Sequence, residues 1–202
     1  LELDDPTSFA YLRIGKCYEK LGNIDMALQY YYKTVHEDPL LDKGWKAITD
    51  FCFRQKNYRK ALYYIKKAID IDGQNISYWK RYAHINTKLS FFEEAERGYQ
   101  KIIELGNYEL ETWLNRSDIL YKIGEYDAAI QNLLQGLEFY PNNAEIEFRL
   151  AGLYYLVNEH HKGQYHLTNA LLSDNEYVII LEELFSNIYK RKSVQDIISK
   201  HI

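Results

Sequence analysis

The sequence predicts an all-α protein, built as a solenoid of helix pairs. First, its 202 residues are 47% hydrophobic but include only 3 Pro and 10 Gly, which disfavours an all-β chain with frequent turns. Second, Trp45, Trp79 and Trp113 lie 34 residues apart. Third, alanines keep the same step further along each interval. A fixed period of this length is typical of stacked helical repeats.

Three columns of residues share this period without an insertion. The tryptophan column continues back to Tyr11. One small-residue column is Ala27, Ala61, Ala95, Ala129 and Gly163, and a second is Gly15, Thr49, Ala83, Ser117 and Ala151. Small residues at fixed positions let two helices pack closely. We expect larger residues to fill the seams between neighbouring repeats, namely Tyr31, Ile65, Tyr99, Leu133 and Leu167.

These columns resemble the tetratricopeptide repeat (TPR) family, whose 34-residue unit is a helix-turn-helix. The segments GNIDMA, KNYRKA, SFFEEA and GEYDAA mark the turn into each second helix, and Pro39 and Pro141 close two units. The resemblance implies a right-handed superhelical solenoid of antiparallel helix pairs. It places five full repeats at 8–41, 42–75, 76–109, 110–143 and 144–177, with 1–7 as the tail of a preceding repeat and 178–202 as a C-terminal capping helix or partial repeat.

Apolar spacing predicts two amphipathic helices in each repeat. In 42–75 the apolar residues three and four apart are Trp45, Ile48 and Cys52 in the first helix, and Leu62, Ile65 and Ile69 in the second. The fifth repeat, 144–177, is degenerate, with Glu147 in the tryptophan slot and Gly163 in the alanine slot. Because glycine weakens a helix interior, we expect its second helix to be the least regular.

Both ends of the chain predict incomplete repeats. Leu1–Asp4 align with Ile69–Asp72, the end of a second helix, so we expect the natural protein to continue with more repeats before Leu1. At the other end, one more first-type helix is predicted by Leu181, Leu184, Phe185 and Ile188, and a short last helix by Val194, Ile197 and Ile198.

Cysteine usage and apolar runs bear on the compartment. Cys17 and Cys52 both lie in apolar helical patterns and are expected to act as small buried hydrophobes, which favours a reducing, cytoplasmic setting. No apolar run reaches the length of a membrane span, so no membrane association is predicted.

Signatures of catalysis and cofactor binding are absent from the sequence. It has no glycine-rich dinucleotide or phosphate loop, no H-E-x-x-H and no C-x-x-C. Glu159, His160 and His161 with His166 come nearest to a metal cluster, but residues six apart on a helix lie on different faces. We predict a partly exposed turn there, no metal or cofactor, and no enzymatic activity.

The tyrosines and tryptophans raise the question of base stacking. Helical RNA readers of similar period use a 35-residue unit and usually need a basic surface. The formal net charge here is −4 and the step is 34 residues, so no nucleic-acid partner is predicted.

The resemblance implies that the first helices line a concave groove that binds partner segments through repeat positions 2, 5, 9, 12 and 13. In the first three repeats these positions hold seven Lys or Arg and two acids, whereas in the last two one Lys faces three acids. The groove therefore predicts a protein partner, bound as a peptide or helical segment that is acidic at one end. The candidate residues are Lys16, Lys20, Lys43, Lys46, Phe53, Arg54, Lys80, His84, Lys88, Tyr121, Phe148 and Tyr155.

Some family members grip the carboxylate end of chaperone tails through Lys, Asn and Arg at fixed positions of three successive repeats. Lys80, Asn115 and Arg149 match that pattern, but His84 and Glu145 do not. An acid at the last position would repel the carboxylate, so no chaperone-tail clamp is predicted.

Two alternatives to a partner-binding module remain. One is a structural scaffold that self-associates, or packs on other domains of a larger chain, through aromatics on second helices: Tyr30, Tyr32, Tyr63 and Tyr64. The other is a regulatory arm of a larger enzyme or sensor.

Overall fold

The structure, a computed structural model, describes residues 6–201, and every regular element among them is helical. The chain divides into two compact units, residues 1–105 (unit 1) and 106–202 (unit 2), which are described separately. The predicted tail of a preceding repeat, 1–7, lies mostly outside the described residues.

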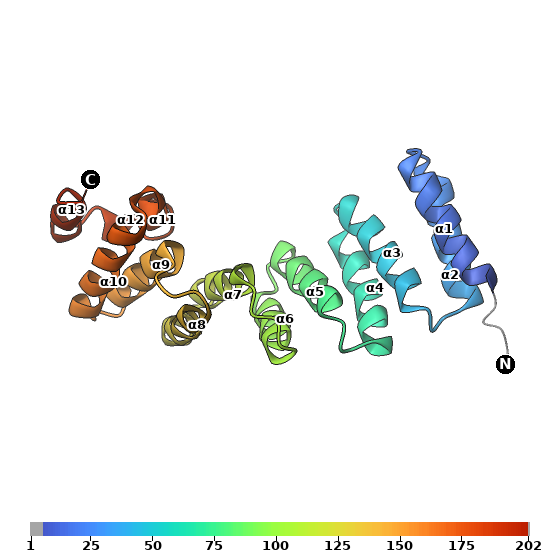
Figure 1. Cartoon of the computed structure of the whole chain (residues 1–202). Coiled ribbons are helices and arrows are strands. Elements are labelled where there is room, and N and C mark those ends of the chain that lie inside the picture. Colours follow the sequence, from blue (N-terminus) through green and yellow to red (C-terminus); the bar gives the residue numbers. More distant parts are fainter. Residues whose placement is uncertain (1–5, 202) are drawn as a thin grey trace. The chain divides into compact units, whose positions relative to one another are not determined.

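Unit 1 consists of three helix pairs, α1 to α6 in Figure 1. Each first helix is joined to its second by a short turn: α1 (Pro6–Lys20) to α2 (Ile24–Glu37), α3 (Asp42–Arg54) to α4 (Tyr58–Ile71), and α5 (Ile76–Lys88) to α6 (Phe92–Glu104). In addition, α2 packs on α3 and α4 packs on α5, so each pair is held to the next.

The predicted small-residue columns lie in the core of these pairs. Ala27, Ala61 and Ala95 are fully buried, and the seam residues Tyr31 and Ile65 are at most 1% exposed. Gly15 is buried where a Cβ atom would lie 2.6 Å from the Tyr31 ring. The close approach of α1 and α2 therefore requires glycine at this position.

The turn inside each helix pair has the same backbone conformation throughout the chain. One residue per turn takes a left-handed φ, between 56° and 83°, and these residues are 34 apart: Gly22, Lys56, Ser90, Gly124 and Asn158. Glycine adopts this conformation at little cost, whereas Lys, Ser and Asn do so at the other three turns.

The tryptophan column has a hydrogen-bonding role that the periodicity did not reveal. The indole N–H of Trp45 donates to the carbonyl of Pro39, and that of Trp79 to the carbonyl of Gly73, both at 2.8 Å. Trp113 donates to Tyr108 at 3.2 Å. Each tryptophan thus ties its own helix to the turn that precedes it.

Unit 2 consists of two helix pairs followed by shorter elements (Figure 1). Its elements are α7 (Leu110–Lys122), α8 (Tyr126–Phe139), α9 (Ala144–Leu156), α10 (His160–Ser173), η1 (Asn175–Val178), α11 (Ile179–Leu184), α12 (Ser186–Tyr189) and α13 (Lys192–Ile198). The prediction that α10 would be the least regular second helix is wrong, since it is continuous over 14 residues. Gly163 serves close packing there, because a Cβ would lie 2.9 Å from the Tyr155 ring.

The C-terminal segment also departs from the prediction. The single helix expected from Leu181 to Ile188 is interrupted at Phe185, whose φ of −130° and ψ of 45° separate α11 from α12. The break lets the Phe185 ring fill the space over Gly152, where a Cβ would lie 2.3 Å from the ring. The short last helix predicted around Val194 is confirmed as α13.

The two cysteines differ in their surroundings. Cys52 is buried in the core of unit 1, and burial raises the pKa of its thiol. Cys17 is exposed, so the prediction that it acts as a small buried hydrophobe is wrong. It lies on the side of α1 that faces away from the helices packed on it.

Candidate functional site

Nine of the twelve predicted groove residues lie on the first helices of unit 1. Lys16 and Lys20 are on α1, Lys43, Lys46, Phe53 and Arg54 on α3, and Lys80, His84 and Lys88 on α5. Six of them are exposed, while Lys46, Phe53 and Lys80 are partly buried. The three helices therefore carry a surface on which positive charge predominates.

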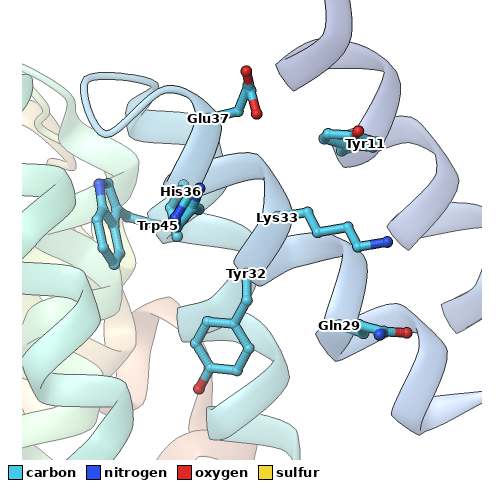
Figure 2. Close-up of a pocket in the computed structure, with 8 residues that line it drawn as sticks. Tyr11, Gln29, Tyr32, Lys33, His36, Glu37 and Trp45 are labelled. Carbon is cyan, nitrogen blue, oxygen red and sulfur yellow. The ribbon is translucent and has the colours of Figure 1, made fainter.

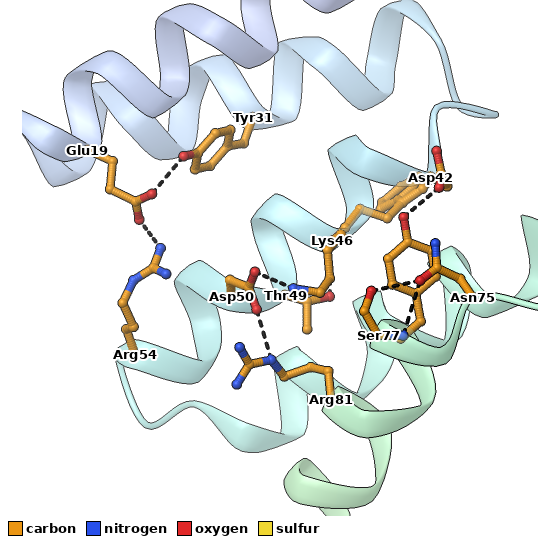
Figure 3. Close-up of polar contacts among 12 residues, drawn as sticks. Glu19, Tyr31, Asp42, Lys46, Thr49, Asp50, Arg54, Asn75, Ser77 and Arg81 are labelled. Atoms are coloured by element: carbon orange, nitrogen blue, oxygen red, sulfur yellow. Dashed lines mark hydrogen bonds and ion pairs between the residues drawn. The ribbon is translucent and has the colours of Figure 1, made fainter. Parts of the chain in front are cut away.

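Asp50 on α3 joins two cations of this surface (Figure 3). Its carboxylate accepts a hydrogen bond from Lys46 Nζ at 2.5 Å and forms an ion pair with Arg81 Nε at 2.9 Å. Since Arg81 lies on α5, the pair also links two first helices. Sequence reasoning missed Arg81 because its repeat position is not one that the family uses for partners.

Glu19 on α1 makes a similar bridge. One carboxylate oxygen accepts a hydrogen bond from the Tyr31 hydroxyl at 2.9 Å, and the other pairs with Arg54 on α3 (Figure 3). Burial raises the pKa of the Tyr31 hydroxyl, so it remains a donor at neutral pH. The predicted groove residue Arg54 is thus already oriented by an acid of its own unit.

The start of α5 is fixed by a second polar group of contacts. Asn75 caps the helix, its side-chain oxygen accepting from the Ser77 backbone N–H at 3.2 Å and from the Ser77 hydroxyl at 2.7 Å. Next to it, the Tyr78 hydroxyl donates to Asp42 at 2.5 Å, and burial together with this hydrogen bond raises the pKa of Tyr78. These contacts set the position of α5 against α3.

Phe53 supports two of the basic side chains. The Arg81 guanidinium lies 4.6 Å from the centre of the Phe53 ring, and the His84 ring lies 4.9 Å from it. A cation over an aromatic face is attracted by the ring quadrupole. Phe53 therefore holds its basic neighbours in place in addition to presenting apolar surface.

The two other predicted aromatic anchors on α9 are not part of an open surface. Phe148 is fully buried and Tyr155 is 4% exposed, so the prediction that they line a groove is wrong for this structure. The reason is the C-terminal segment, since η1, α11 and α12 all pack on α9. Tyr121 on α7 is half-buried and donates its hydroxyl to the Leu184 carbonyl at 3.1 Å.

Arg149 on α9 is engaged by two acids of unit 2. Its guanidinium pairs with Asp118 on α7 and with Glu145 at 3.1 Å, and its side chain is 10% exposed. Glu145 is the residue that departs from the chaperone-tail pattern in the sequence. In the structure this acid neutralises the arginine that the pattern would use to hold a carboxylate.

His166 is buried, whereas the sequence predicted a partly exposed turn for the whole histidine cluster. Its Nδ1 lies 2.5 Å from the Glu147 carboxylate, and its ring stacks on Tyr154 with centroids 5.1 Å apart. Glu159, His160 and His161 are exposed at the start of α10, as predicted. Across residues 6–201, no three His, Cys, Asp or Glu side chains form a group that could hold a metal ion.

A larger cavity of about 700 Å³ opens beside α2 in unit 1 (Figure 2). Its lining mixes aromatic and charged side chains: Tyr11, Gln29, Tyr32, Lys33, Val35, His36, Glu37 and Trp45. Lys33 Nζ lies 5.9 Å from the centre of the Tyr11 ring. Sequence reasoning missed this cavity because it assigned Tyr11 and Trp45 entirely to the repeat core.

Comparison with known proteins agrees with the helix-pair architecture. Residues 9–40 match a family model described as tetratricopeptide repeat, and residues 118–157 match one described as TPR repeat. These matches, one in each unit, are joined by the period and the fold described above. The chain belongs to the tetratricopeptide repeat family.

Among curated relatives, a TPR repeat-containing protein of Methanocaldococcus jannaschii is 26% identical over 175 residues, which are 76% of this chain and 30% of that protein. The Hsp70-Hsp90 organizing protein of Triticum aestivum is 25% identical over 122 residues, 60% of this chain and 20% of its own length. The chain thus spans between a fifth and a third of the length of these relatives.

Two solved structures share the fold at low identity. MamA superposes with a TM-score of 0.72 at 17% identity, covering 85% of this chain and 94% of MamA. YrrB, described as a TPR protein with an unusual peptide-binding site, gives a TM-score of 0.71 at 17% identity, covering 85% and 89%. Within the described part of this chain, no helix has the length and apolar character required to cross a bilayer.

Proposed function

We propose that this chain is a protein–protein interaction module without enzymatic activity. Its first helices in unit 1, α1, α3 and α5, bind a peptide or helical segment of a partner that is acidic over part of its length. The proposed contacts are Lys16, Lys20, Lys43, Lys46, Phe53, Arg54, Lys80, His84 and Lys88. The division of residues 8–177 into five 34-residue repeats belongs to the same proposal.

One observation carries this proposal: cations on the three first helices are oriented by acids of the same unit. Glu19 holds Arg54, and Asp50 holds Lys46 and Arg81. Ordering a long charged side chain before binding reduces the entropy lost in the complex. A basic surface also steers an acidic segment toward the unit and disfavours basic ones.

The relatives support this class of function in general terms. An Hsp70-Hsp90 organizing protein is named for bringing two proteins together, and YrrB is described as having a peptide-binding site. At 17% identity the likeness to YrrB extends to the fold alone. Since Glu145 neutralises Arg149 in unit 2, we place the partner site in unit 1 and do not propose a chaperone-tail clamp.

A peptide-display selection against the whole chain tests the proposal. Selected peptides should be enriched in Asp and Glu, and the triple variant Lys43→Glu, Lys46→Glu, Lys80→Glu should bind them at least about tenfold more weakly, because close charge pairs become repulsive. A matched triple reversal on α4, at Lys60, Lys66 and Lys67, changes the net charge equally and should leave the affinity unchanged. Equal binding by both triple variants would refute the proposal.

The self-associating scaffold is the alternative that a specific observation favours. Tyr63 on α4 is 58% exposed and Tyr32 on α2 is 39% exposed, so second helices present aromatic surface. A mass that rises with concentration in light scattering, and that Tyr32→Ser with Tyr63→Ser abolishes, would support the scaffold. The regulatory-arm alternative depends on other domains, which a full-length reading frame would reveal.

Both cysteines are free thiols, which supports the proposed reducing, cytoplasmic setting. Localisation of the full-length protein by fluorescence imaging tests this part of the proposal. A protein found outside the cytoplasm would contradict it.

A further inference from the structure

A cavity of about 300 Å³ opens beside α3 and α5 in unit 1, and its lining is strongly basic. The lining residues are Lys46 from α3 and Ser77, Lys80, Arg81 and His84 from α5. The proposed function treats Lys46, Lys80 and His84 only as parts of a broad surface. The cavity itself calls for a more specific ligand.

Its basic groups are held in place by residues around them. Asp50 bonds Lys46 Nζ at 2.5 Å and Arg81 Nε at 2.9 Å, and the three side chains are 22% to 28% exposed. The Phe53 ring supports Arg81 at 4.6 Å and His84 at 4.9 Å. The lining is therefore pre-organised, which favours a ligand that needs fixed donors.

The charge of the cavity exceeds what one carboxylate would neutralise. Three cations, Lys46, Lys80 and Arg81, share the single negative charge of Asp50, which leaves an excess of two positive charges. A side-chain carboxylate carries one negative charge. A phosphorylated side chain carries about −1.5 to −2 at neutral pH and presents three acceptor oxygens.

The geometry of Arg81 also fits a phosphoryl group. Asp50 bonds the guanidinium through Nε, so this ion pair leaves the terminal Nη groups for another acceptor. The planar donors of arginine match phosphate oxygens in a bidentate arrangement, while lysine acts on phosphate as a point charge. The Ser77 hydroxyl adds a further polar group to the lining.

We propose that this cavity binds the phosphoryl group of a phosphorylated side chain in the partner segment. Arg81 forms the bidentate contact, Lys46 and Lys80 supply charge, and phosphorylation of the partner strengthens its binding to unit 1. This inference rests on the proposed function and specifies its ligand. It involves binding alone and no transfer of the phosphoryl group.

The test is a titration of the ¹⁵N-labelled whole chain with three probes at constant ionic strength. The probes are N-acetyl-phosphoserine amide, N-acetyl-glutamate amide and inorganic phosphate, and the reporters are the Arg81 Nε–H signal and the amides of 77–84. We expect phosphoserine to shift these signals to saturation and to bind about tenfold more tightly than glutamate, through its added charge and donors. Equal affinity for glutamate, or tighter binding of free phosphate, would overturn the proposal.

Two variants and one matched control locate the binding. Arg81→Gln and Lys80→Ala should each weaken phosphoserine binding by about fivefold or more, since each removes a charged contact. Lys66→Ala removes the same charge from an exposed position on α4 and should bind like the wild type. Because Arg81→Gln also breaks the ion pair with Asp50, Lys80→Ala provides a second test if the first variant folds poorly. Unchanged affinity in a folded Lys80→Ala variant would refute the assignment.

Failure of this inference is distinguishable from failure of the proposed function. If display-selected acidic peptides bind and the triple charge reversal weakens them, but phosphoserine causes no shift at Arg81, only the phosphoryl site is wrong. If phosphoserine binds but no peptide does, only the protein-segment proposal is wrong.

Discussion

Glu147 and His166 form a buried pair, with the carboxylate 2.5 Å from the imidazole Nδ1, at the step of the sequence where tryptophan is due. Glu147 is 5% exposed and His166 is 8% exposed. A polar pair thus replaces the indole that Trp45, Trp79 and Trp113 provide at earlier steps.

Breaking this pair should destabilise unit 2 strongly. Glu147→Ala leaves a buried imidazole without its partner, and losses of about 3–5 kcal/mol follow when one member of a buried pair is removed. Hydrogen exchange at the amides of α9 and α10 measures the local free energy of opening. The double variant Glu147→Leu, His166→Leu should recover much of the loss, because it removes both polar groups.

A surface pair in the same region is the control. Glu159 and Lys162 are 3.6 Å apart with both side chains more than half exposed, so Glu159→Ala should cost less than about 1 kcal/mol. Similar losses for Glu147→Ala and Glu159→Ala would contradict the assigned role of the buried pair.

Gly152→Ala should displace the C-terminal segment from α9. The added Cβ would lie 2.3 Å from the Phe185 ring, and overpacking of this kind costs about 1–3 kcal/mol. Limited proteolysis should then cut between α11 and α13 more rapidly. Phe185→Leu in the Gly152→Ala background should slow cleavage again.

Gly73→Ala is the matched control for this substitution. An added Cβ at Gly73 meets its nearest atom, the Ile69 carbonyl oxygen, at 3.4 Å, which is ordinary contact. Equal proteolysis rates for the wild type and Gly152→Ala would show that Phe185 does not depend on the missing side chain.

Ser90→Gly should stabilise unit 1 by about 0.5–1 kcal/mol. Ser90 has a φ of 59°, and the strain that an L-residue carries there outweighs the entropy cost of glycine. Urea unfolding measures the change. The reciprocal variant Gly22→Ala should destabilise through the backbone alone, since its Cβ would meet no atom within 4 Å. A loss of stability in Ser90→Gly would contradict this account of the turn.

Stability should fall as the pH rises above about 10, the ordinary pKa of tyrosine. The pKa of Tyr78 is raised in the folded state, so the stability linked to its proton is fully present below that pH and is lost as the pH rises through the folded pKa. Urea unfolding at pH 8, 9.5 and 11 should show a shallower decline for Tyr78→Phe. The exposed control Tyr63→Phe should decline like the wild type, and identical slopes for all three proteins would refute the prediction.

The sequence was sufficient to predict the features that repeat. Ala27, Ala61 and Ala95 occur at the same point of successive repeats, and close helix packing demands a small side chain there each time. A requirement repeated at a fixed interval is visible in one sequence. The basic character of α1, α3 and α5 followed in the same way from positions counted along the period.

Features that occur once were not predictable in this manner. Phe185 interrupts a helix because a space over Gly152 accepts its ring, and no local pattern encodes that distant space. Burial of Phe148 and Tyr155 follows from the same segment folding back on α9. His166 looked like part of an exposed cluster because its partner, Glu147, lies on another helix. Arg81 was missed because its partner Asp50 comes from the preceding helix pair.

The indole bonds of Trp45 and Trp79 bear on how such a chain can lengthen. Each donor and its acceptor are six residues apart, so the joint between successive helix pairs is made entirely from residues at that joint. A copy of residues 42–75 inserted after residue 75 would bring its own tryptophan to the Gly73 carbonyl and offer its own glycine carbonyl to Trp79. The joint is therefore interchangeable, and duplication of a whole period preserves it, whereas insertion of a single residue between donor and acceptor would not.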